Sequence, residues 1–387
     1  MSTPVLDTKY PAIGTTIFTV MSALAAEHQA VNLGQGFPDF DCDPRLVQCV
    51  TDAMQRGLNQ YPPMTGVPVL REAIARKIDT LYGRHYHATA EITVTAGATQ
   101  AILSVILAVV RAGDEVIVLE PCYDSYIPNI DMAGGVAVRV PLTPGTFRPD
   151  FDKIRAAITP RTRAILVNTP HNPSATVWRR EEWLALQELL HGTDILLLSD
   201  EVYEHMVYAP LSHLSAASFP GLAERAFIIS SFGKTYHVTG WKVGYVAAPA
   251  ALSAEFRKVH QFNVFTVNTP VQHALAAYMA DPAPYLDLPA FYAAKRDLFR
   301  AGLARTQFEL LPSEGSYFQC VRIDGLGVPE KDLPEAEFCQ WLTREIGVAA
   351  IPLSAFYADG FDQRVIRFCY AKKDETLRLA LQRLAQL

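Results

Sequence analysis

One lysine of this chain lies among residues that suit covalent chemistry on an aldehyde. Lys234 stands in the segment Ser231-Phe232-Gly233-Lys234-Thr235, and a second cation, Lys242, follows eight residues later. A lysine amine attacks an aldehyde when its surroundings favour the neutral form. The hydroxyl of Ser231 and the cation of Lys242 are both suited to a phosphate group. The spacing therefore indicates a covalently held aldehyde that carries a phosphate.

Two other interpretations of this segment are open on its residues alone. Lysine after glycine is common, and most lysines are solvated surface residues. The Ser231-x-x-Lys234 pair also matches the Ser-x-x-Lys of penicillin-binding enzymes, which needs Ser-Asp-Asn and Lys-Thr-Gly further on. The chain offers only Ser199-Asp200-Glu201, upstream and altered, and Lys234-Thr235-Tyr236. The penicillin-binding interpretation is therefore disfavoured, and the rest of the chain must decide.

Two segments could hold the phosphate and the ring of such a molecule. Gly97-Ala98-Thr99 opens an expected helix, where free backbone N–H groups suit a phosphate. A plain strand-to-helix turn with Thr99 near the N-cap fits equally well. Tyr123 follows the next expected strand, and its ring could stack on a planar cofactor ring or simply fill the core.

Three polar residues follow two further expected strands. Asp200 ends an apolar run, where a carboxylate is costly unless it is paired, and a protonated pyridine nitrogen would be a suitable partner. Capping of the following turn is the alternative role for Asp200. Tyr203 lies three residues on, within reach of an oxygen on the same ring. Asn172, in a turn with Pro170 and Pro173, could donate to that oxygen or merely shape the turn.

Arg367 lies inside the apolar run 365–370 and also needs a partner. Its guanidinium could bind the carboxylate of an amino acid through two parallel hydrogen bonds, or it could form an internal salt bridge.

Together, these residues supply an aldehyde anchor, a phosphate cradle, a stacking aromatic, a carboxylate for a ring nitrogen, donors for a ring oxygen and a substrate clamp. Pyridoxal phosphate is the cofactor with that anatomy, and it is the predicted cofactor.

The elements expected to position these residues alternate between strands and helices from about residue 90 to 250. The expected strands lie at 92–95, 115–119, 137–140, 164–168, 195–199, 227–230 and 243–247, and helices at 99–111 and 180–191 lie between some of them. This alternation predicts an α/β domain with a largely parallel sheet between helices. Ligands of such sheets sit beyond the carboxyl ends of the strands, where the candidate residues gather.

The pattern changes after about residue 270. Helices at 286–304, 335–346 and 375–387 and strands at 317–321 and 365–370 predict a smaller α+β domain. Residues before about 35 have weak periodicity and are expected to form an arm that packs on something else, such as a second subunit. The predicted division is an arm over 1–35 that joins the small domain, a large cofactor-binding domain over 36–272 and a small domain over 273–387.

Composition narrows the class of protein. The length of 387 residues predicts two domains. The formal net charge of −6 gives no sign of a nucleic-acid or membrane partner. Its six cysteines form no Cys-x-x-Cys pair and no zinc spacing, so we expect reduced thiols, a cytoplasmic protein and no metal site. The N-terminus lacks a signal-peptide pattern. The longest apolar run, 101–110, is too short for a membrane span and predicts a buried helix.

Over nearly its whole length, the chain resembles the fold-type I, pyridoxal-phosphate-dependent class I and II aminotransferases. The likeness is nearest to the kynurenine/glutamine aminotransferase branch and, within it, to bacterial methionine aminotransferases. The motifs that carry it are Val31-Asn32-Leu33-Gly34-Gln35-Gly36-Phe37-Pro38-Asp39-Phe40, Gln60-Tyr61-Pro62-Pro63-Met64-Thr65-Gly66, residues 168–173, 199–203 and 231–244, and Arg367.

The resemblance implies a role for each candidate residue. Lys234 would be the Schiff-base lysine, Asp200 the partner of the ring nitrogen, Asn172 and Tyr203 the holders of the ring's 3-oxygen, Ala98, Thr99, Ser231 and Lys242 the phosphate ligands, and Tyr123 the residue over the ring. Three roles are implied by the resemblance alone. Tyr61 would reach the phosphate of the neighbouring subunit in an obligatory homodimer. The Gly36 backbone would help Arg367 and Asn172 bind the substrate carboxylate, and Phe18 would line the substrate pocket.

The resemblance also implies an activity. The chain would move an amino group from an uncharged or aromatic L-amino acid, methionine above others, to a 2-oxo acid by ping-pong kinetics. Lys242 stands where aspartate aminotransferases use arginine, which weakens an aspartate assignment, and Pro173-Ser174-Ala175-Thr176 departs from the usual turn. A carbon–sulfur β-lyase with the same lysine is the alternative. A non-catalytic regulator on this scaffold is disfavoured, because such regulators usually carry a DNA-binding module, for which we find no room before Tyr10.

Overall fold

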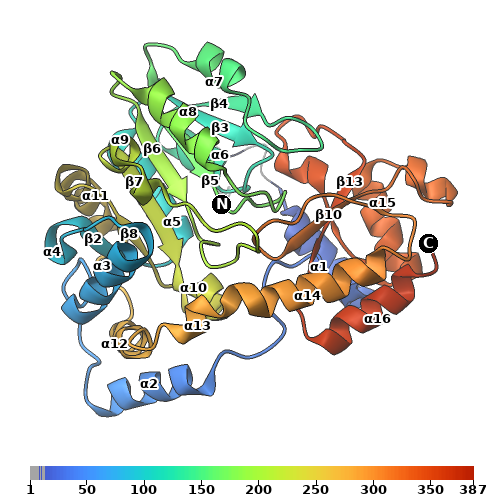
Figure 1. Cartoon of the computed structure of the whole chain (residues 1–387), viewed down its shortest axis with the longest axis horizontal. Helices are drawn as coiled ribbons and strands as arrows, with labels where there is room; N and C mark the ends of the chain where they lie inside the picture. Colours follow the sequence, from blue (N-terminus) through green and yellow to red (C-terminus); the bar gives the residue numbers. More distant parts are fainter. Residues whose placement is uncertain (1–7, 9, 11–13) are drawn as a thin grey trace, which may run out of the picture.

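The structure is a computed structural model, and it describes residues 8, 10 and 14–387. Within this part of the chain, the largest sheet has seven strands in the order β2-β8-β7-β6-β5-β3-β4 (Figure 1). The strands are β2 (Ile92–Thr95), β3 (Glu115–Glu120), β4 (Val136–Pro141), β5 (Thr162–Asn168), β6 (Leu196–Asp200), β7 (Ala226–Ser231) and β8 (Gly244–Ala247). Strands β4, β3, β5, β6 and β7 run parallel, and β8 is antiparallel to both β7 and β2. The predicted, mostly parallel α/β sheet is confirmed.

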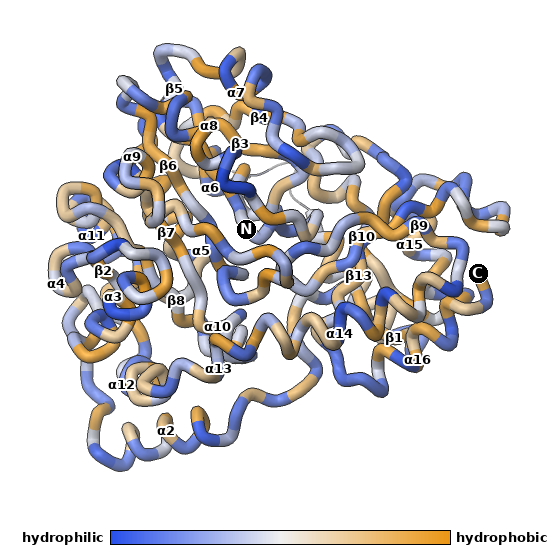
Figure 2. Tube along the Cα trace, viewed as in Figure 1, coloured by the Kyte–Doolittle hydropathy of each residue, from blue (hydrophilic) through white to orange (hydrophobic). Residues whose placement is uncertain are grey.

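The inner strands of this sheet are buried on both faces because they are apolar at successive positions, whereas the edge strand β4 is partly exposed. In β7, Phe227 and Ile229 join a cluster with helices α5 (Ala98–Val109), α6 (Tyr126–Met132) and α11 (Ala250–Asn263). Ala226 and Ile228 belong to the larger cluster on the other side. Figure 2 shows hydrophobic residues running along β6 and its neighbours. Burial on both faces is what a parallel sheet between helices requires.

The helices of this part of the chain precede, separate or follow the strands of the large sheet. They are α2 (Pro44–Gln55), α3 (Pro68–Tyr82), α4 (Ala88–Glu91), α5 (Ala98–Val109), α6 (Tyr126–Met132), α7 (Phe151–Ala157), α8 (Arg180–Leu190), α9 (Pro220–Ala223), α10 (Phe232–Thr235), α11 (Ala250–Asn263) and α12 (Thr269–Tyr278), with 3₁₀ turns η1 (Ala216–Ser218) and η2 (Thr239–Trp241). Helix α5 contains most of the predicted apolar run, and it is buried as expected. No helix in the described ranges is long and apolar enough to cross a membrane.

The C-terminal part forms a second, antiparallel sheet in the order β12-β13-β10-β9. Its strands are β9 (Glu309–Leu310), β10 (Phe318–Arg322), β12 (Ile351–Pro352) and β13 (Val365–Cys369). The helices here are α13 (Ala283–Leu286), α14 (Leu288–Leu303), α15 (Glu335–Trp341) and α16 (Asp374–Leu384), with turns η3 (Pro329–Asp332), η4 (Leu342–Ile346) and η5 (Leu353–Phe356). The helix expected at 335–346 changes at residue 342 into the single π-helical turn η4.

The N-terminal segment contains a helix that we did not predict, α1 (Ile17–Glu27). Its periodicity is weak because Met21 and Ala25 are its only fully buried residues. After it, β1 (Val31–Asn32) pairs in parallel with β11 (Val348–Ala349), so the segment packs on the C-terminal part of its own chain. The proposed boundaries at 35/36 and 272/273 stay predictions, and residues 1–7, 9 and 11–13 of the arm lie outside the described residues.

Candidate active site

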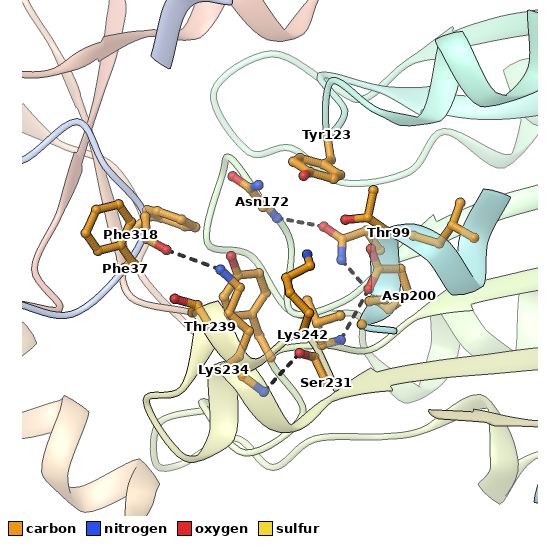
Figure 3. Close-up of a pocket in the computed structure, with 18 of the residues that line it drawn as sticks. Phe37, Thr99, Tyr123, Asn172, Asp200, Ser231, Lys234, Thr239, Lys242 and Phe318 are labelled. Atoms are coloured by element: carbon orange, nitrogen blue, oxygen red, sulfur yellow. Dashed lines mark hydrogen bonds between the residues drawn. The ribbon is translucent and has the colours of Figure 1, made fainter. Parts of the chain in front are cut away.

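A cavity of about 340 Å³ lies beyond the carboxyl ends of β5, β6 and β7. The last residues of these strands, Asn168, Asp200 and Ser231, all line it, as does Arg367 of β13. Of the predicted site residues, the cavity brings together Phe18, Gly36, Ala98, Thr99, Tyr123, Asn172, Asp200, Tyr203, Ser231, Lys234, Lys242 and Arg367. Figure 3 shows Lys242 and Lys234 beside the space that Tyr123, Asn172 and Asp200 border. Residues far apart in the sequence therefore meet in one site.

The Lys234 amine lies inside this cavity, on the short helix α10. It donates hydrogen bonds to the Gly36 carbonyl oxygen at 3.2 Å and to the Tyr317 hydroxyl oxygen at 3.0 Å. Burial lowers the pKa of Lys234 to about 8, and the positive charges of Arg367 and Lys242 act in the same direction. A substantial share of the amine is therefore neutral near pH 8, which is the form that attacks aldehydes and accepts protons.

Asp200 ends β6 with its carboxylate turned toward the cavity. Burial raises the pKa of Asp200 to about 6, while the Tyr126 hydroxyl, which donates to its Oδ2 at 2.5 Å, opposes that effect. The Val202 N–H also donates to its Oδ1 at 3.3 Å, so Asp200 caps the following turn as well. No cation of the described chain forms a salt bridge with this carboxylate, which leaves it suited to a cationic ring nitrogen.

Arg367 is 1% exposed and has no carboxylate within salt-bridge distance in the part of the chain described. The internal salt bridge considered from the sequence is therefore not found. Its Nη1 donates to the Asn172 Oδ1 at 2.5 Å and its Nη2 to the Gly34 carbonyl at 3.2 Å, whereas none of the described residues accepts from its Nε. A buried guanidinium with a spare donor is suited to an anionic ligand.

The backbone at the start of α5 is shaped for an anion. Gly97 has φ +83°, and no side chain caps the helix start, so the first N–H groups of α5 are free to bind a ligand. Gly244 allows β8 to approach closely, because a Cβ there would lie 2.6 Å from the Ser230 carbonyl oxygen. Lys242 has a left-handed φ of 55°, uncommon for a lysine, and its ammonium lies beside Gly97.

Aromatic rings form the other walls. Tyr123 packs edge-to-face on Tyr126, and Tyr203 packs edge-to-face on Tyr317. On the side nearest Arg367, Phe18 and Phe318 flank the guanidinium, with its Cζ 5.6 and 4.0 Å from their ring centres. This side of the cavity is therefore positively charged at one point and apolar around it.

Tyr61 is the one predicted site residue that does not line the cavity. It is 81% exposed, and its ring contacts Phe265. Since the structure contains one chain, the predicted contact of Tyr61 with a neighbouring subunit is not tested.

Sequence reasoning missed several residues of the site, among them Phe318, Tyr126, Tyr317 and Asn168. Tyr126 binds Asp200, and Tyr317 binds Lys234. Asn168 donates to the Asp200 carbonyl at 3.0 Å and accepts from the Asn172 N–H at 2.8 Å. Asn168 ends an expected strand and could have been found by the argument used for Asp200. Tyr126 and Tyr317 carry no comparable signal, because a buried tyrosine is an ordinary core residue.

Comparison with known proteins places this site in a family. A family model for class I and II aminotransferases matches residues 28–384. A methionine aminotransferase from Escherichia coli strain K12 is 53% identical over 382 residues, 98% of each chain. Kynurenine–oxoglutarate transaminase 3 from Rattus norvegicus is 36% identical to this chain, and the match covers 94% of this chain and 86% of the transaminase. A crystal structure of a methionine aminotransferase from Escherichia coli is similar with a TM-score of 0.97 and 52% identity, over the full length of both chains.

These matches confirm the resemblance seen in the sequence, including its kynurenine and methionine aminotransferase branches. They give the carbon–sulfur lyase alternative no support, because the relatives are aminotransferases. This chain belongs to the class I and II aminotransferases, which are pyridoxal-phosphate-dependent enzymes.

Proposed function

We propose that this aminotransferase takes its amino group from methionine or another uncharged or aromatic L-amino acid. The observation that carries the proposal is Arg367, a buried guanidinium with a free Nε, flanked by Phe18 and Phe318. A substrate carboxylate would form an ion pair with Arg367, and an uncharged substrate side chain would lie against the aromatic rings. The relatives named for methionine and kynurenine support the same class of substrate.

The residues present fit pyridoxal phosphate. The uncapped start of α5, Ser231 and Lys242 would bind the phosphate, and Tyr123 would cover the ring. Asp200 would pair with the ring nitrogen. Tyr203 and the Asn172 Nδ2 would hold the 3-oxygen, because the Asn172 Oδ1 already accepts from Arg367. When bound, this cofactor supplies an aldehyde that captures the amino group and a ring that accepts electrons.

The chain's own residues would perform three tasks in the reaction. Arg367 and the Gly36 backbone bind the substrate carboxylate and so orient the Cα–H bond. Lys234, once its amine is free and neutral, would take the proton from Cα and later return it at the carbon that was the cofactor's aldehyde carbon, as general base and then general acid. Asp200 keeps negative charge beside the ring throughout.

Removing the guanidinium tests the substrate clamp. We expect Arg367→Ala to raise the KM for methionine about 100-fold, because a buried carboxylate would lose its charged partner. Turnover of a panel of amino acids, scored by 2-oxo acid formation, measures this and ranks the donors. The absorbance of bound cofactor should stay unchanged in the variant. An unaltered KM, or a panel in which aspartate or glutamate exceeds methionine and the aromatic amino acids, would contradict the proposal.

We also propose that the enzyme is a homodimer in which Tyr61 completes the phosphate site of the partner. Tyr61 is highly exposed, and its ring contacts Phe265, which is 48% exposed, so the two rings form an aromatic surface that a partner would cover. Co-expression of Tyr61→Ala with Lys234→Ala tests it, since each mixed dimer would contain one intact site. We expect about a quarter of wild-type activity from random pairing, against far less from either variant alone. Activity no greater than the sum of the two variants would refute the shared site.

A cytoplasmic location is proposed as well. All six cysteines lie among the described residues and are free thiols, four of them buried. Proteins of oxidising compartments commonly use disulfides instead. Cell fractionation that found the enzyme in another compartment would contradict this assignment.

A further inference from the structure

We propose that Tyr317 is a positioning residue that orients the free amine of Lys234 for proton transfer. This inference rests on the proposed role of Lys234. Tyr317 lies just before β10 of the second sheet, and its hydroxyl contacts the Lys234 amine. It does not line the cavity, so it acts on the reaction through Lys234.

The hydrogen bonds around the amine determine where its lone pair can point. The Tyr317 hydroxyl donates its own proton to the Gly36 carbonyl oxygen at 2.6 Å, so its oxygen is free to accept from Lys234 at 3.0 Å. The Gly36 oxygen also accepts from Lys234, at 3.2 Å. A neutral amine has two N–H bonds and one lone pair. With both N–H groups bound to these two oxygens, the lone pair is directed away from them.

The two oxygens are themselves held in place. Tyr317 is fully buried, packed against Tyr203, Tyr292 and Phe318 at ring-centre distances of 5.2, 5.6 and 5.0 Å. Burial raises the pKa of Tyr317 well above its ordinary value, so the hydroxyl keeps its proton. Gly36 lies so near Phe318 that a Cβ there would come within 3.1 Å of the ring. The acceptors of the amine are therefore rigid.

Orientation of this lone pair serves both tasks proposed for Lys234. In attachment, the nitrogen attacks the aldehyde carbon, a carbon–nitrogen double bond forms, and one water leaves. In transamination, the lone pair takes the Cα proton of the substrate, and the electron pair left on carbon passes to the cofactor. Both steps need the lone pair of Lys234 directed at the reacting atom. A misoriented reacting group lowers the rate without weakening substrate binding.

The test compares two variants that each lose one buried hydroxyl. Tyr317→Phe removes one of the two acceptors of the amine and leaves the Gly36 carbonyl oxygen. Tyr292→Phe is the matched control, because its hydroxyl has no hydrogen-bond partner among the described residues, although its ring contacts Tyr317. We expect Tyr317→Phe to lower kcat about 10- to 100-fold with KM nearly unchanged, and Tyr292→Phe to do neither.

Two further measurements separate positioning from general structural damage. The kinetic isotope effect with Cα-deuterated methionine should rise in Tyr317→Phe, because proton transfer becomes slower relative to the other steps. The rate at which cofactor-free protein binds pyridoxal phosphate covalently should also fall, and thermal unfolding shows whether both variants fold equally well. Rates, isotope effect and attachment equal to those of Tyr292→Phe, or a loss confined to KM, would overturn the proposal.

Mapping the modified lysine distinguishes failure of this inference from failure of the proposed function. Borohydride reduction of the loaded wild-type protein, digestion and mass spectrometry show which lysine carries the phosphopyridoxyl group. A group on another lysine would overturn the proposed site, and this inference with it. A group on Lys234, together with wild-type rates in Tyr317→Phe, would overturn the inference alone.

Discussion

The Lys234→Ala protein is expected to lose at least about 10⁴-fold in kcat/KM for amino transfer, because we propose that one amine serves as attachment point, general base and general acid. Its pKa of about 8 and its place in the cavity beside Arg367 suit all three tasks. The variant should still bind pyridoxal phosphate without a covalent bond, since the start of α5, Ser231 and Asp200 remain. The measurements are steady-state rates and the absorbance of the loaded protein.

A matched control for this prediction is Lys258→Ala. Lys258 lies on the outer part of α11, where its amine pairs with the Glu255 carboxylate and is largely exposed. Its removal should leave rates within about twofold of wild type, as is usual for surface substitutions. If Lys234→Ala kept more than about a hundredth of wild-type turnover, another group would have to perform the proton transfer.

Asp200→Asn should separate catalysis from stability. We expect it to lower kcat/KM about 10³-fold, because the buried negative charge proposed to balance the ring nitrogen is lost. The cofactor-free variant should nevertheless be more stable than wild type, by about 1–3 kcal/mol at pH 8. The reason is that wild type holds an ionised carboxylate in a buried place without a cationic partner, and asparagine keeps the shape without the charge.

The pH dependence of this gain follows from the raised pKa of Asp200. In the unfolded chain the group titrates near its ordinary value, about 3.9, and in the folded protein at about 6. The folded state therefore binds the proton more tightly, and the unfolding free energy of wild type falls as pH rises through this window. The advantage of Asp200→Asn should be complete above about pH 6 and absent near pH 4. Urea unfolding of cofactor-free protein at pH 4.5 and pH 8 measures it.

Glu204→Gln is the control of opposite sign. Glu204 is also buried, but the Lys77 ammonium lies 2.7 Å from its Oε1, and Tyr82 donates to its Oε2 at 2.5 Å. Burial alone would raise the pKa of Glu204, yet the charge and hydrogen bond of Lys77, together with His205 and the Ser230 hydroxyl, lower it below its ordinary value. Its neutralisation should destabilise the protein by about 3 kcal/mol or more, because Lys77 stays buried without a counter-charge. If both variants lost stability at pH 8, the raised pKa of Asp200 would be wrong.

The seven-stranded sheet was predictable because its strands repeat a simple physical pattern. Apolar runs such as 164–168 and 195–199 end in polar residues, and the structure places β5 and β6 within two residues of these ranges. Helices α1, α2 and α3 were not predicted. In α1 the buried residues are few, so the periodicity that identifies an amphipathic helix is faint.

The site was predictable where a residue type conflicts with its surroundings. Asp200 and Arg367 are charges in apolar strands, which calls for a partner, and both line the cavity. Tyr126 and Tyr317 were not predictable because a buried tyrosine conflicts with nothing, and only the fold brings their hydroxyls to Asp200 and Lys234. The resemblance added Gly36 and Phe18, which no argument from polarity would have singled out.

The most direct test of the central claim follows the nitrogen atom itself. Methionine labelled with ¹⁵N is incubated with the enzyme, pyridoxal phosphate and a 2-oxo acid, and the products are separated by mass spectrometry. The account predicts that ¹⁵N appears in the amino acid formed from the 2-oxo acid, in equal amount to the 2-oxo acid made from methionine, and that Lys234→Ala forms almost none. Release of ¹⁵N as ammonia, or equal transfer by Lys234→Ala, would contradict it.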